Sequence, residues 1–316
     1  MKRILAIFMI MSLAFILSAC RNNDVETIRF AVSRHDQASL AIIASEMGFF
    51  EEQGLNVEIT YLPSGVETFQ AVISNSADIA TTMDVVVANF GFAEDLNISA
   101  VASINTTAST SIVARRSAGI ESPEDLRGMR LALSPGTSSE IYAMNFFDMH
   151  DLTDDVEIVR MQANTISAAI ISGSVDAIAA FGPFLFNAQT ALAEDAIVFN
   201  EDIVFDVLLV ANTNFAYEDR DSIIRLMRAI EMASEFASEN MFEAQEIIAR
   251  VVNLDYEYVA EIWQFHDFRV VFGAESLDRV IAIGEFYMDD EVNRGRPFPD
   301  YSNFFDFSFI EELRGD

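Results

Sequence analysis

One stretch of this sequence occurs twice, and the duplication limits the fold more than any other feature. The segment AVISNSADIATT (71–82) resembles AIISGSVDAIAA (169–180). Upstream, IRFAVS (28–33) resembles MRLALS (129–134), and VEI (57–59) recurs at 156–158. Chance explains any single short match, but three in the same order and at nearly constant spacing indicate two units of roughly 100 residues, a typical domain size. The identical pairs of the longest match are Ala71/Ala169, Ile73/Ile171, Ser74/Ser172, Ser76/Ser174 and Asp78/Asp176.

Both copies predict the same order of elements. Runs rich in β-branched and aromatic residues predict strands, and apolar residues at helical spacing predict helices. The alternating order implies parallel strands with right-handed crossovers, so each copy is expected to form a small, open, mostly parallel α/β sheet flanked by helices. Strands are expected at 27–32, 55–62, 77–82, 129–134, 155–161 and 175–181, with helices at 40–54, 68–76, 141–151 and 166–174.

Two further strands are expected to join the lobes as a hinge. The segment 109–119 leaves the first lobe and the segment 204–213 returns to it. After residue 213 the sequence turns mostly helical, with an apolar stripe in 219–240 that is expected to pack on the first lobe. We therefore expect lobe one at 28–114 and 207–316, and lobe two at 115–206.

The first twenty residues have the layout of an export signal. A basic start is followed by an apolar run at 4–17 that is shorter than the roughly 20 residues needed to span a bilayer. The tetrad LSAC, ending at Cys20, resembles the bacterial lipobox, whose Cys is lipidated. This pattern predicts a signal peptide at 1–19, a tether at 20–27 and an extracytoplasmic protein anchored to the bacterial cell membrane by lipid. The alternative is an ordinary signal peptide with a coincidental Cys.

Composition excludes several classes of function. The net charge of −31 repels phosphate backbones, so the chain is not expected to bind nucleic acid. The single Cys excludes an internal disulfide framework. Every cation after Lys2 is Arg, which keeps its charge where Lys loses it. The acidity fits either a solvated surface of an exported protein or adaptation to salty or alkaline surroundings.

A ligand is expected where the loops of the two lobes face each other. In open α/β sheets, ligands bind beyond the carboxyl ends of the strands, and the helices that begin there offer free N–H groups to an anion or polar oxygen. Ser39 and Asp84 are candidates in the first lobe. The loops that follow strands are 33–40, 63–67, 81–84, 134–140, 162–165 and 181–184.

Several motifs resemble the solute-binding lipoproteins of ABC importers for nitrate, aliphatic sulfonates, taurine and thiamine pyrimidine precursors. The resemblance covers about residues 28–310 and implies the two-lobed type II periplasmic-binding-protein fold, which closes around a solute by a hinge motion. It also implies a permease and an ATPase as partners. The motifs are ASEMGFFEEQGLNVEITYLPSG, SPEDLRGMRLALSPGTSSE, SGSVDAIAAFGPF and PFPDYSNFFDFSFIEEL.

The resemblance also implies particular ligand contacts. In lobe one, Ser64, Gly65 and Thr82 match contact loops of the family, and in lobe two the contact loop matches Gly136, Thr137 and Ser138. Phe181 stands where the family usually has Trp. The only Trp, Trp263, lies in a segment that matches the last helices of the family, and packing in the core is the expected role.

Enzyme activity is not expected. The residues His35, His150 and His266 lie in unrelated segments without the spacing of metal ligands, and Lys is absent after position 2. His35 lies in a candidate cleft loop, where it is expected to be an ordinary polar residue. We therefore predict a monomeric binding protein without cofactor or metal. A ligand sensor for a membrane receptor is the alternative from another class.

The nature of the solute stays open. Helix N-termini favour a sulfonate or nitrate, yet the candidate loops hold one cation, Arg34, beside the acids Asp36, Glu67, Asp84 and Glu140. A zwitterion such as taurine satisfies both observations. An aminopyrimidine stacked on Phe181 does so too, because an aromatic face suits a flat heterocycle.

The change Gly136→Asp is expected to abolish solute binding. It fills the loop and places an anion at the start of a helix. The measurement is the solute-induced rise in melting temperature of the variant and the wild type. Unchanged affinity in the variant would remove this loop from the site.

Overall fold

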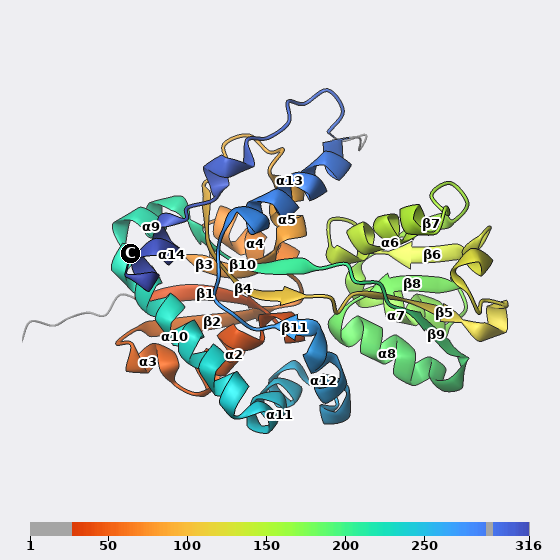
Figure 1. Cartoon of the computed structure of the whole chain (residues 1–316), viewed down its shortest axis with the longest axis horizontal. Helices are drawn as coiled ribbons and strands as arrows, with labels where there is room; N and C mark the ends of the chain where they lie inside the picture. Colours follow the sequence, from red (N-terminus) through yellow and green to blue (C-terminus); the bar gives the residue numbers. More distant parts are fainter. Residues whose placement is uncertain (1–26, 289–292, 316) are drawn as a thin grey trace, which may run out of the picture.

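The computed structural model describes residues 27–288 and 293–315. The expected signal peptide, Cys20 and nearly all of the tether lie outside the described residues. Two sheets with their helices form two lobes side by side (Figure 1). We call the six-stranded sheet with its helices lobe one and the five-stranded sheet with its helices lobe two. The two-lobed α/β fold expected from the sequence is confirmed.

Each sheet contains three adjacent parallel strands. The six-stranded sheet has the order β11 (His266–Asp267), β4 (Ile98–Thr107), β10 (Phe205–Asn212), β3 (Ile79–Met83), β1 (Thr27–Ser33) and β2 (Asn56–Leu62). The five-stranded sheet has the order β7 (Glu157–Arg160), β6 (Arg130–Leu133), β8 (Ala177–Ala180), β5 (Ser111–Arg115) and β9 (Ala196–Phe199). The parallel strands are β2, β1 and β3 in lobe one, and β7, β6 and β8 in lobe two.

The remaining strands make both sheets mixed, while most strands of each sheet still run in one direction, as the sequence predicted. Strand β10 pairs antiparallel with both β3 and β4, and β5 pairs antiparallel with both β8 and β9. These additional strands include those that carry the chain from one lobe to the other. A chain that leaves a sheet and returns to it must run in both directions, so the pairings at the crossings are antiparallel.

The chain changes sheets earlier than the sequence suggested. Strand β5 was expected in lobe one up to residue 114, but it pairs within the five-stranded sheet. The crossings are therefore the short segments 108–110 and 200–204 between strands. The Ser111 hydroxyl donates to Asn200 Oδ1, which ties the start of β5 to the second crossing.

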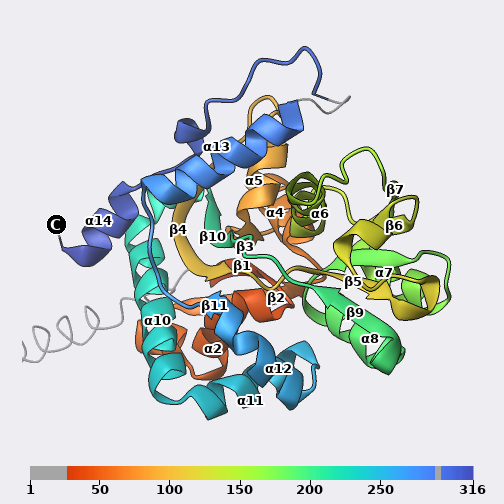
Figure 2. The same cartoon turned by 45° about the vertical axis from the view of Figure 1, so that its right-hand side comes forward.

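Helices cover both faces of each sheet (Figures 1 and 2). In lobe one, α4 (Gly65–Ile73), α5 (Asp84–Phe90) and α13 (Ala274–Met288) lie on one side, and α2 (Ser39–Glu46), α3 (Phe49–Glu52) and α10 (Arg220–Glu239) lie on the other. In lobe two, α6 (Ser138–Met149) lies opposite α7 (Ala163–Ile171) and α8 (Gly182–Leu192). The other α-helices of the described residues are α9 (Thr213–Glu218), α11 (Met241–Val252), α12 (Tyr256–Ile262) and α14 (Ser308–Arg314).

The alternation of side chains along β8 produces two separate apolar layers in lobe two. Ala177 and Ala179 face α6 and belong to the large core, which continues into lobe one. Ile178 and Ala180 face α7 and α8 and belong to a second, smaller core. Successive residues of a strand point to opposite faces, so a short apolar run buries both sides of a sheet.

The C-terminal helices pack on lobe one, as the sequence predicted. Helix α10 buries Ile223, Met227, Ile230 and Ala233, which follow helical spacing, while charged residues occupy its other face. Within the described residues, every helix is too short or too polar to span a bilayer.

The repeated residues of the sequence build the same turn in both lobes. The Asp78 carboxylate accepts from the backbone N–H of Arg29 at 2.8 Å, and Asp176 accepts in the same way from Arg130 at 3.1 Å. Before each Asp, a pair of hydroxyls lies in contact, Ser74 with Ser76 and Ser172 with Ser174. These contacts fix the start of β3 on β1 and of β8 on β6, at the strand ends away from the cleft.

Removing either Asp is expected to destabilise its lobe. Asp78→Ala and Asp176→Ala each remove the carboxylate acceptor of an exposed strand N–H, which costs about 0.5–1.5 kcal/mol because water can take its place. The two losses should add, because the residues lie in different sheets. Urea unfolding of both variants measures the effect, with the exposed Asp154→Ala as control. A midpoint equal to that of the wild type would show that the turns form without the carboxylates.

Candidate functional site

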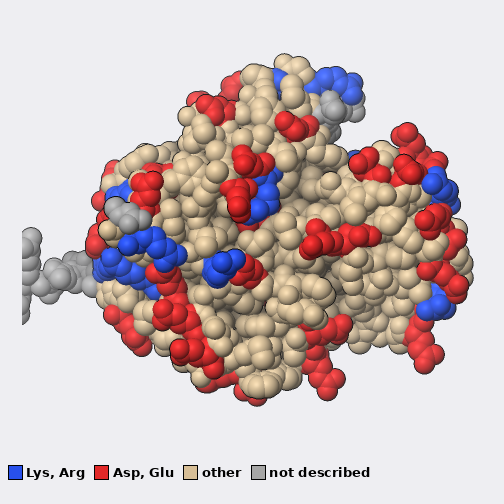
Figure 3. All heavy atoms as spheres, in the orientation of Figure 1, with Lys and Arg blue, Asp and Glu red and all other residues tan. Residues whose placement is uncertain are grey.

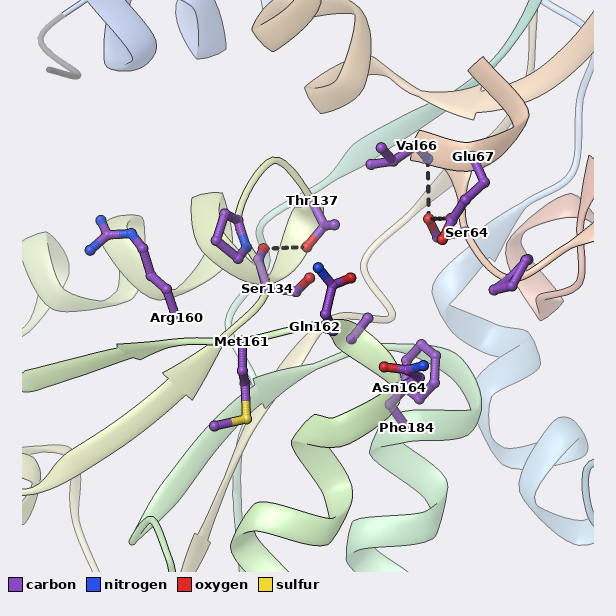
Figure 4. A pocket seen from close by; sticks show the side chains of 13 residues that line it. Ser64, Val66, Glu67, Ser134, Thr137, Arg160, Met161, Gln162, Asn164 and Phe184 are labelled. Carbon is purple, nitrogen blue, oxygen red and sulfur yellow. Dashed lines mark hydrogen bonds between the residues drawn. The ribbon is translucent and has the colours of Figure 1, made fainter. Parts of the chain in front are cut away.

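A cleft of about 520 Å³ lies between the two lobes (Figure 4). One wall comes from the start of α4 in lobe one, and the opposite wall comes from the loops after β6, β7 and β8 in lobe two. These are the carboxyl ends of the parallel strands, where the sequence placed the ligand. The lining residues are Pro63, Ser64, Val66, Glu67, Ser134, Pro135, Thr137, Arg160, Met161, Gln162, Ala163, Asn164 and Phe184.

The floor of the cleft is nearly closed. A small cavity of about 20 Å³ adjoins the cleft and shares three of its residues, Ser64, Val66 and Thr137. This volume holds about one water molecule, so the lobes are close together here. Its other lining residues are Ser33, His35, Gln37, Gly65, Thr82, Met83, Val86, Ser138, Phe181 and Val207.

Most residues predicted for the site lie on these walls. The cleft or its floor is lined by Ser64, Gly65, Thr82, Thr137, Ser138 and Phe181. Their contact with a solute stays a prediction.

Three predicted residues line neither cavity. Ser39 is fully buried at the start of α2 and donates to the carbonyl of Asp36. Asp84 is buried beneath the floor, and Gly136 lies behind the rim, where its N–H donates to Glu140 Oε2 at 2.9 Å. All three lie in strand-end loops, but the local backbone directs them into contacts within the protein.

Four helices begin at the cleft or its floor and direct their N–H groups toward it. Ser64 and Thr137 cap α4 and α6, where each side chain accepts from a backbone N–H. The first residues of α7 and α8 follow Gln162 and Phe181, which make no such side-chain cap. Helix N-termini carry partial positive charge, so this arrangement suits an anionic or polar oxygen.

Among the described residues, Glu67 and Arg160 are the only charged side chains that line the cleft. Glu67 accepts a hydrogen bond from the Ser64 hydroxyl (Figure 4). Arg160 is 59 % exposed at the rim, with its Nε atom 3.6 Å from Glu140 Oε1. Arg34, the one cation of the candidate loops, lines neither cavity, and its Nε atom donates to the carbonyl of Val251 at 2.8 Å. The walls therefore act more through dipoles than through net charge.

The hydroxyl groups of the cleft present oxygen lone pairs. Thr82 donates its proton to the carbonyl of Gly65, and Thr137 donates to the carbonyl of Ser134, each at 2.8 Å. The Ser64 proton is likewise committed to Glu67. These oxygens are left as acceptors, and they suit a solute that carries N–H or O–H groups.

His35 is part of the floor, in a more specific place than the sequence indicated. Its Nε2–H donates to the carbonyl of Pro63, and its ring lies edge-on to Phe181 and Phe184 at 5.6 and 5.7 Å between centroids. Burial lowers the pKa of His35, so the imidazole is neutral at physiological pH. Its Nδ1 atom is then a buried acceptor without a partner among the described residues.

Trp263 has the packing role expected of it. Its ring lies 4.6 Å from that of Phe268 and belongs to the edge of the large core. It lines neither cavity.

Sequence reasoning missed Arg160, Met161, Val86 and Val207. The first two were placed in a strand, but β7 ends at Arg160, so both reach the cleft wall. The rule that ligands bind at strand ends would have found them. Val86 and Val207 come from a helix and a hinge strand that reach the floor only through the tertiary fold.

The two lobes and their cleft define a protein with a two-lobed binding-protein fold. The chain belongs to the NMT1/THI5-like family, whose model matches residues 37–244. The family resemblance inferred from the sequence is thereby confirmed.

Two curated relatives are similar over most of the chain. A protein of Bacillus subtilis (strain 168) named for the binding of aliphatic sulfonates is 22 % identical over 271 residues, with 81 % of both chains covered. The formylaminopyrimidine-binding protein of Halalkalibacterium halodurans is 22 % identical over 275 residues, which cover 78 % of this chain and 79 % of the relative.

Two solved structures show the same fold. The alkanesulfonate-binding protein SsuA from Xanthomonas axonopodis pv. citri, bound to MOPS, superposes with a TM-score of 0.76 at 15 % identity and covers 89 % of this chain and 98 % of that one. The desulfurization enzyme DSZB superposes with a TM-score of 0.68 at 14 % identity, covering 92 % and 99 %. The fold thus occurs in both binding proteins and an enzyme.

Asp84 joins helix α5 to the hinge strand β10 beneath the floor. Its carboxylate accepts from the backbone N–H of Val85 at 2.7 Å and of Asp206 at 2.8 Å. Asp206 in turn pairs with Arg279 of α13 at 2.6 Å. Burial, with the nearby Asp206 carboxylate, raises the pKa of Asp84 from its ordinary 3.8 to about 8.

This pKa predicts how stability depends on pH. The folded protein holds a proton on Asp84 that the unfolded chain releases above its ordinary pKa. The contribution of this proton to the free energy of unfolding is therefore complete at low pH, and it is lost as the pH rises from about 4 to about 8. Asp84→Asn, which mimics the neutral acid, should flatten the profile of urea midpoint against pH, whereas exposed Glu52→Gln should not. Parallel profiles for Asp84→Asn and the wild type would contradict the assignment.

Proposed function

We propose that this protein is the extracytoplasmic solute-binding component of an ABC importer and that it encloses a small polar solute with an anionic group, of the sulfonate, taurine or nitrate type. The observation that carries the proposal is the cleft in which helix N-termini from both lobes face one enclosed space. The membership in the NMT1/THI5-like family and the relative named for aliphatic sulfonates support it.

The negative charge of the protein does not oppose this solute class at short range. Acidic side chains are spread over both lobes on the face shown in Figure 3. Exposed charges are screened beyond the Debye length of about 8 Å at physiological ionic strength. Each helix N-terminus stabilises a bound anion by about 0.3–1 kcal/mol, and it does so at short range. Local dipoles therefore decide which group is held once the solute has entered.

The acceptor groups of the cleft favour a solute that also carries N–H groups. Glu67 and the oxygens of Ser64, Thr82 and Thr137 suit an amine or ammonium group. A zwitterion of the taurine type matches both sets of groups. The alternative solute is a flat heterocycle such as a thiamine pyrimidine precursor. The aromatic rings of Phe181 and Phe184 and the relative named for formylaminopyrimidine support this alternative.

The cellular role follows from the N-terminal signal. We propose that Cys20 is lipidated, that it anchors a monomer to the outer face of the cell membrane, and that the protein delivers its solute to a membrane permease driven by an ATPase. The alternative role is that of a ligand sensor for a membrane receptor. Identifying the membrane protein that binds this protein distinguishes the two roles.

Catalysis is not part of the proposal, although DSZB shares the fold. Among the described residues, no group of three or more His, Cys, Asp or Glu is arranged to hold a metal ion. The buried His35 is neutral, and its Nε2–H is committed to the carbonyl of Pro63. The polar groups of the cleft suit binding.

A thermal-shift panel on the form that lacks residues 1–20 tests the solute class. The panel contains taurine, alkyl sulfonates, nitrate, bicarbonate and aminopyrimidines. A solute at 100 times its Kd should stabilise the protein by about 2.7 kcal/mol, which gives a clear rise in melting temperature. Stabilisation by taurine or a sulfonate supports the proposed class. Stabilisation by aminopyrimidines alone selects the alternative, and no response at all contradicts both.

A further inference from the structure

The lobes touch each other at both edges of the cleft. At one edge, the hydroxyl of Tyr258 donates to the carbonyl of Gly182 at 3.3 Å, and the ring of Tyr258 lies 4.6 Å from that of Phe186. At the other edge, the hydroxyl of Tyr287 lies 3.4 Å from Glu140 Oε2. In each contact the Tyr belongs to lobe one and its partner to lobe two. The lobes are therefore in direct contact on both sides of the cleft, an arrangement that we call closed.

Gly182 approaches lobe one too closely for any other residue. A Cβ atom at this position would lie 2.9 Å from Asp36 Oδ1 and 3.2 Å from His35 Nδ1. Contacts below 3.0 Å are essentially never made by real Cβ atoms. These neighbours are also firmly held, because His35 and Asp36 are only 3 % and 2 % exposed. The His35 ring is hydrogen-bonded to the carbonyl of Pro63, and Asp36 Oδ2 lies 3.1 Å from His266 Nε2.

Gly136 makes the matching approach at the other edge. A Cβ atom there would lie 2.8 Å from Asn89 Nδ2 of lobe one. The Asn89 amide group is the far end of a flexible side chain on α5. Asn89 is only partly buried, so this group has more freedom to move than the carboxylate of Asp36. Both glycines also adopt positive φ, +48° at Gly182 and +70° at Gly136.

We propose that Gly136 and Gly182 set the distance at which the lobes close and thereby limit the size of the solute. The inference rests on the proposed solute-binding function and adds the residues that determine its size selectivity. A side chain at either position meets lobe one before the closed distance is reached. The closed cleft of about 520 Å³ is available only because both positions lack a Cβ atom.

Two other glycines of lobe two provide matched controls. Gly119 and Gly128 also have positive φ, +88° and +75°, but a Cβ atom at either has no neighbour within 4 Å. Alanine there carries the same kind of backbone strain without touching lobe one. Any difference between Gly182→Ala and Gly128→Ala therefore reports the contact between lobes.

Closure is measured by crosslinking, which needs no solute. The form lacking residues 1–20 has no Cys, so the pair Phe186→Cys and Tyr258→Cys forms a unique crosslink with a short bifunctional thiol reagent. Gly182→Ala should slow this crosslink about tenfold, and Gly136→Ala less, whereas the two control variants should match the parent. Adding Asn89→Ala to Gly136→Ala should restore the rate. A Gly182→Ala rate equal to that of Gly128→Ala would overturn the proposal.

Solute size gives the second measurement. Affinities are compared for taurine and for the larger sulfonate MOPS, without the two Cys substitutions. Gly182→Ala should weaken taurine binding about tenfold and MOPS binding less, because a cleft held open loses contacts with the small solute first. Equal losses for both would overturn the role in size selection. Binding of neither by the wild type would contradict the proposed solute class, and the crosslinking result would still decide the role of the glycines.

Discussion

The parallel pairing of three strands in each lobe is the constraint on which the rest of the structure depends. Parallel strands place all their carboxyl ends at one edge of a sheet, and the helices that follow must begin at that edge. The crossings at 108–110 and 200–204 then join the lobes so that these two edges face one space. The helix N-termini, the caps Ser64 and Thr137, and the loops after β6, β7 and β8 all reach the cleft for this reason. The site thus follows from strand direction.

Strand direction also explains where the repeated residues lie. Asp78 and Asp176 fix the beginnings of β3 and β8, whereas the cleft receives the ends of the same strands. The identical Asp residues at the beginnings of β3 and β8 give both lobes the same scaffold. The ends differ, with Thr81 and Thr82 in one lobe and Ala179 and Ala180 in the other. A duplicated scaffold with different strand ends produces two unlike walls, which is what the recognition of an asymmetric solute requires.

The sequence predicted the elements well because their signals are local. Hydrophobic periodicity located the strands and helices of both lobes, and the strand-end rule located the cleft loops. Within those loops the family resemblance pointed to Ser64, Thr82, Thr137 and Phe181, which line the cleft or its floor. The errors arise where tertiary contacts decide. Strand β5 could join either sheet by its own pattern, and only its pairing with β8 and β9 assigns it to lobe two. Asp84 looked like a cleft residue, but two backbone N–H groups, one of them from a strand 122 residues away, draw its carboxylate inward.

The polar groups beneath the cleft connect its floor to the strand that leaves lobe one. Asp36, which faces Gly182, lies 3.1 Å from His266, and His266 lies 2.9 Å from Asn105 of β4. Asn105 also donates to the carbonyl of Gln37, and β4 ends at Thr107, just before the first crossing. Buried polar groups of this kind hold a fixed geometry because each loses much free energy without its partner. The surface of lobe one that meets lobe two and the strand that carries the first crossing therefore belong to one hydrogen-bonded network.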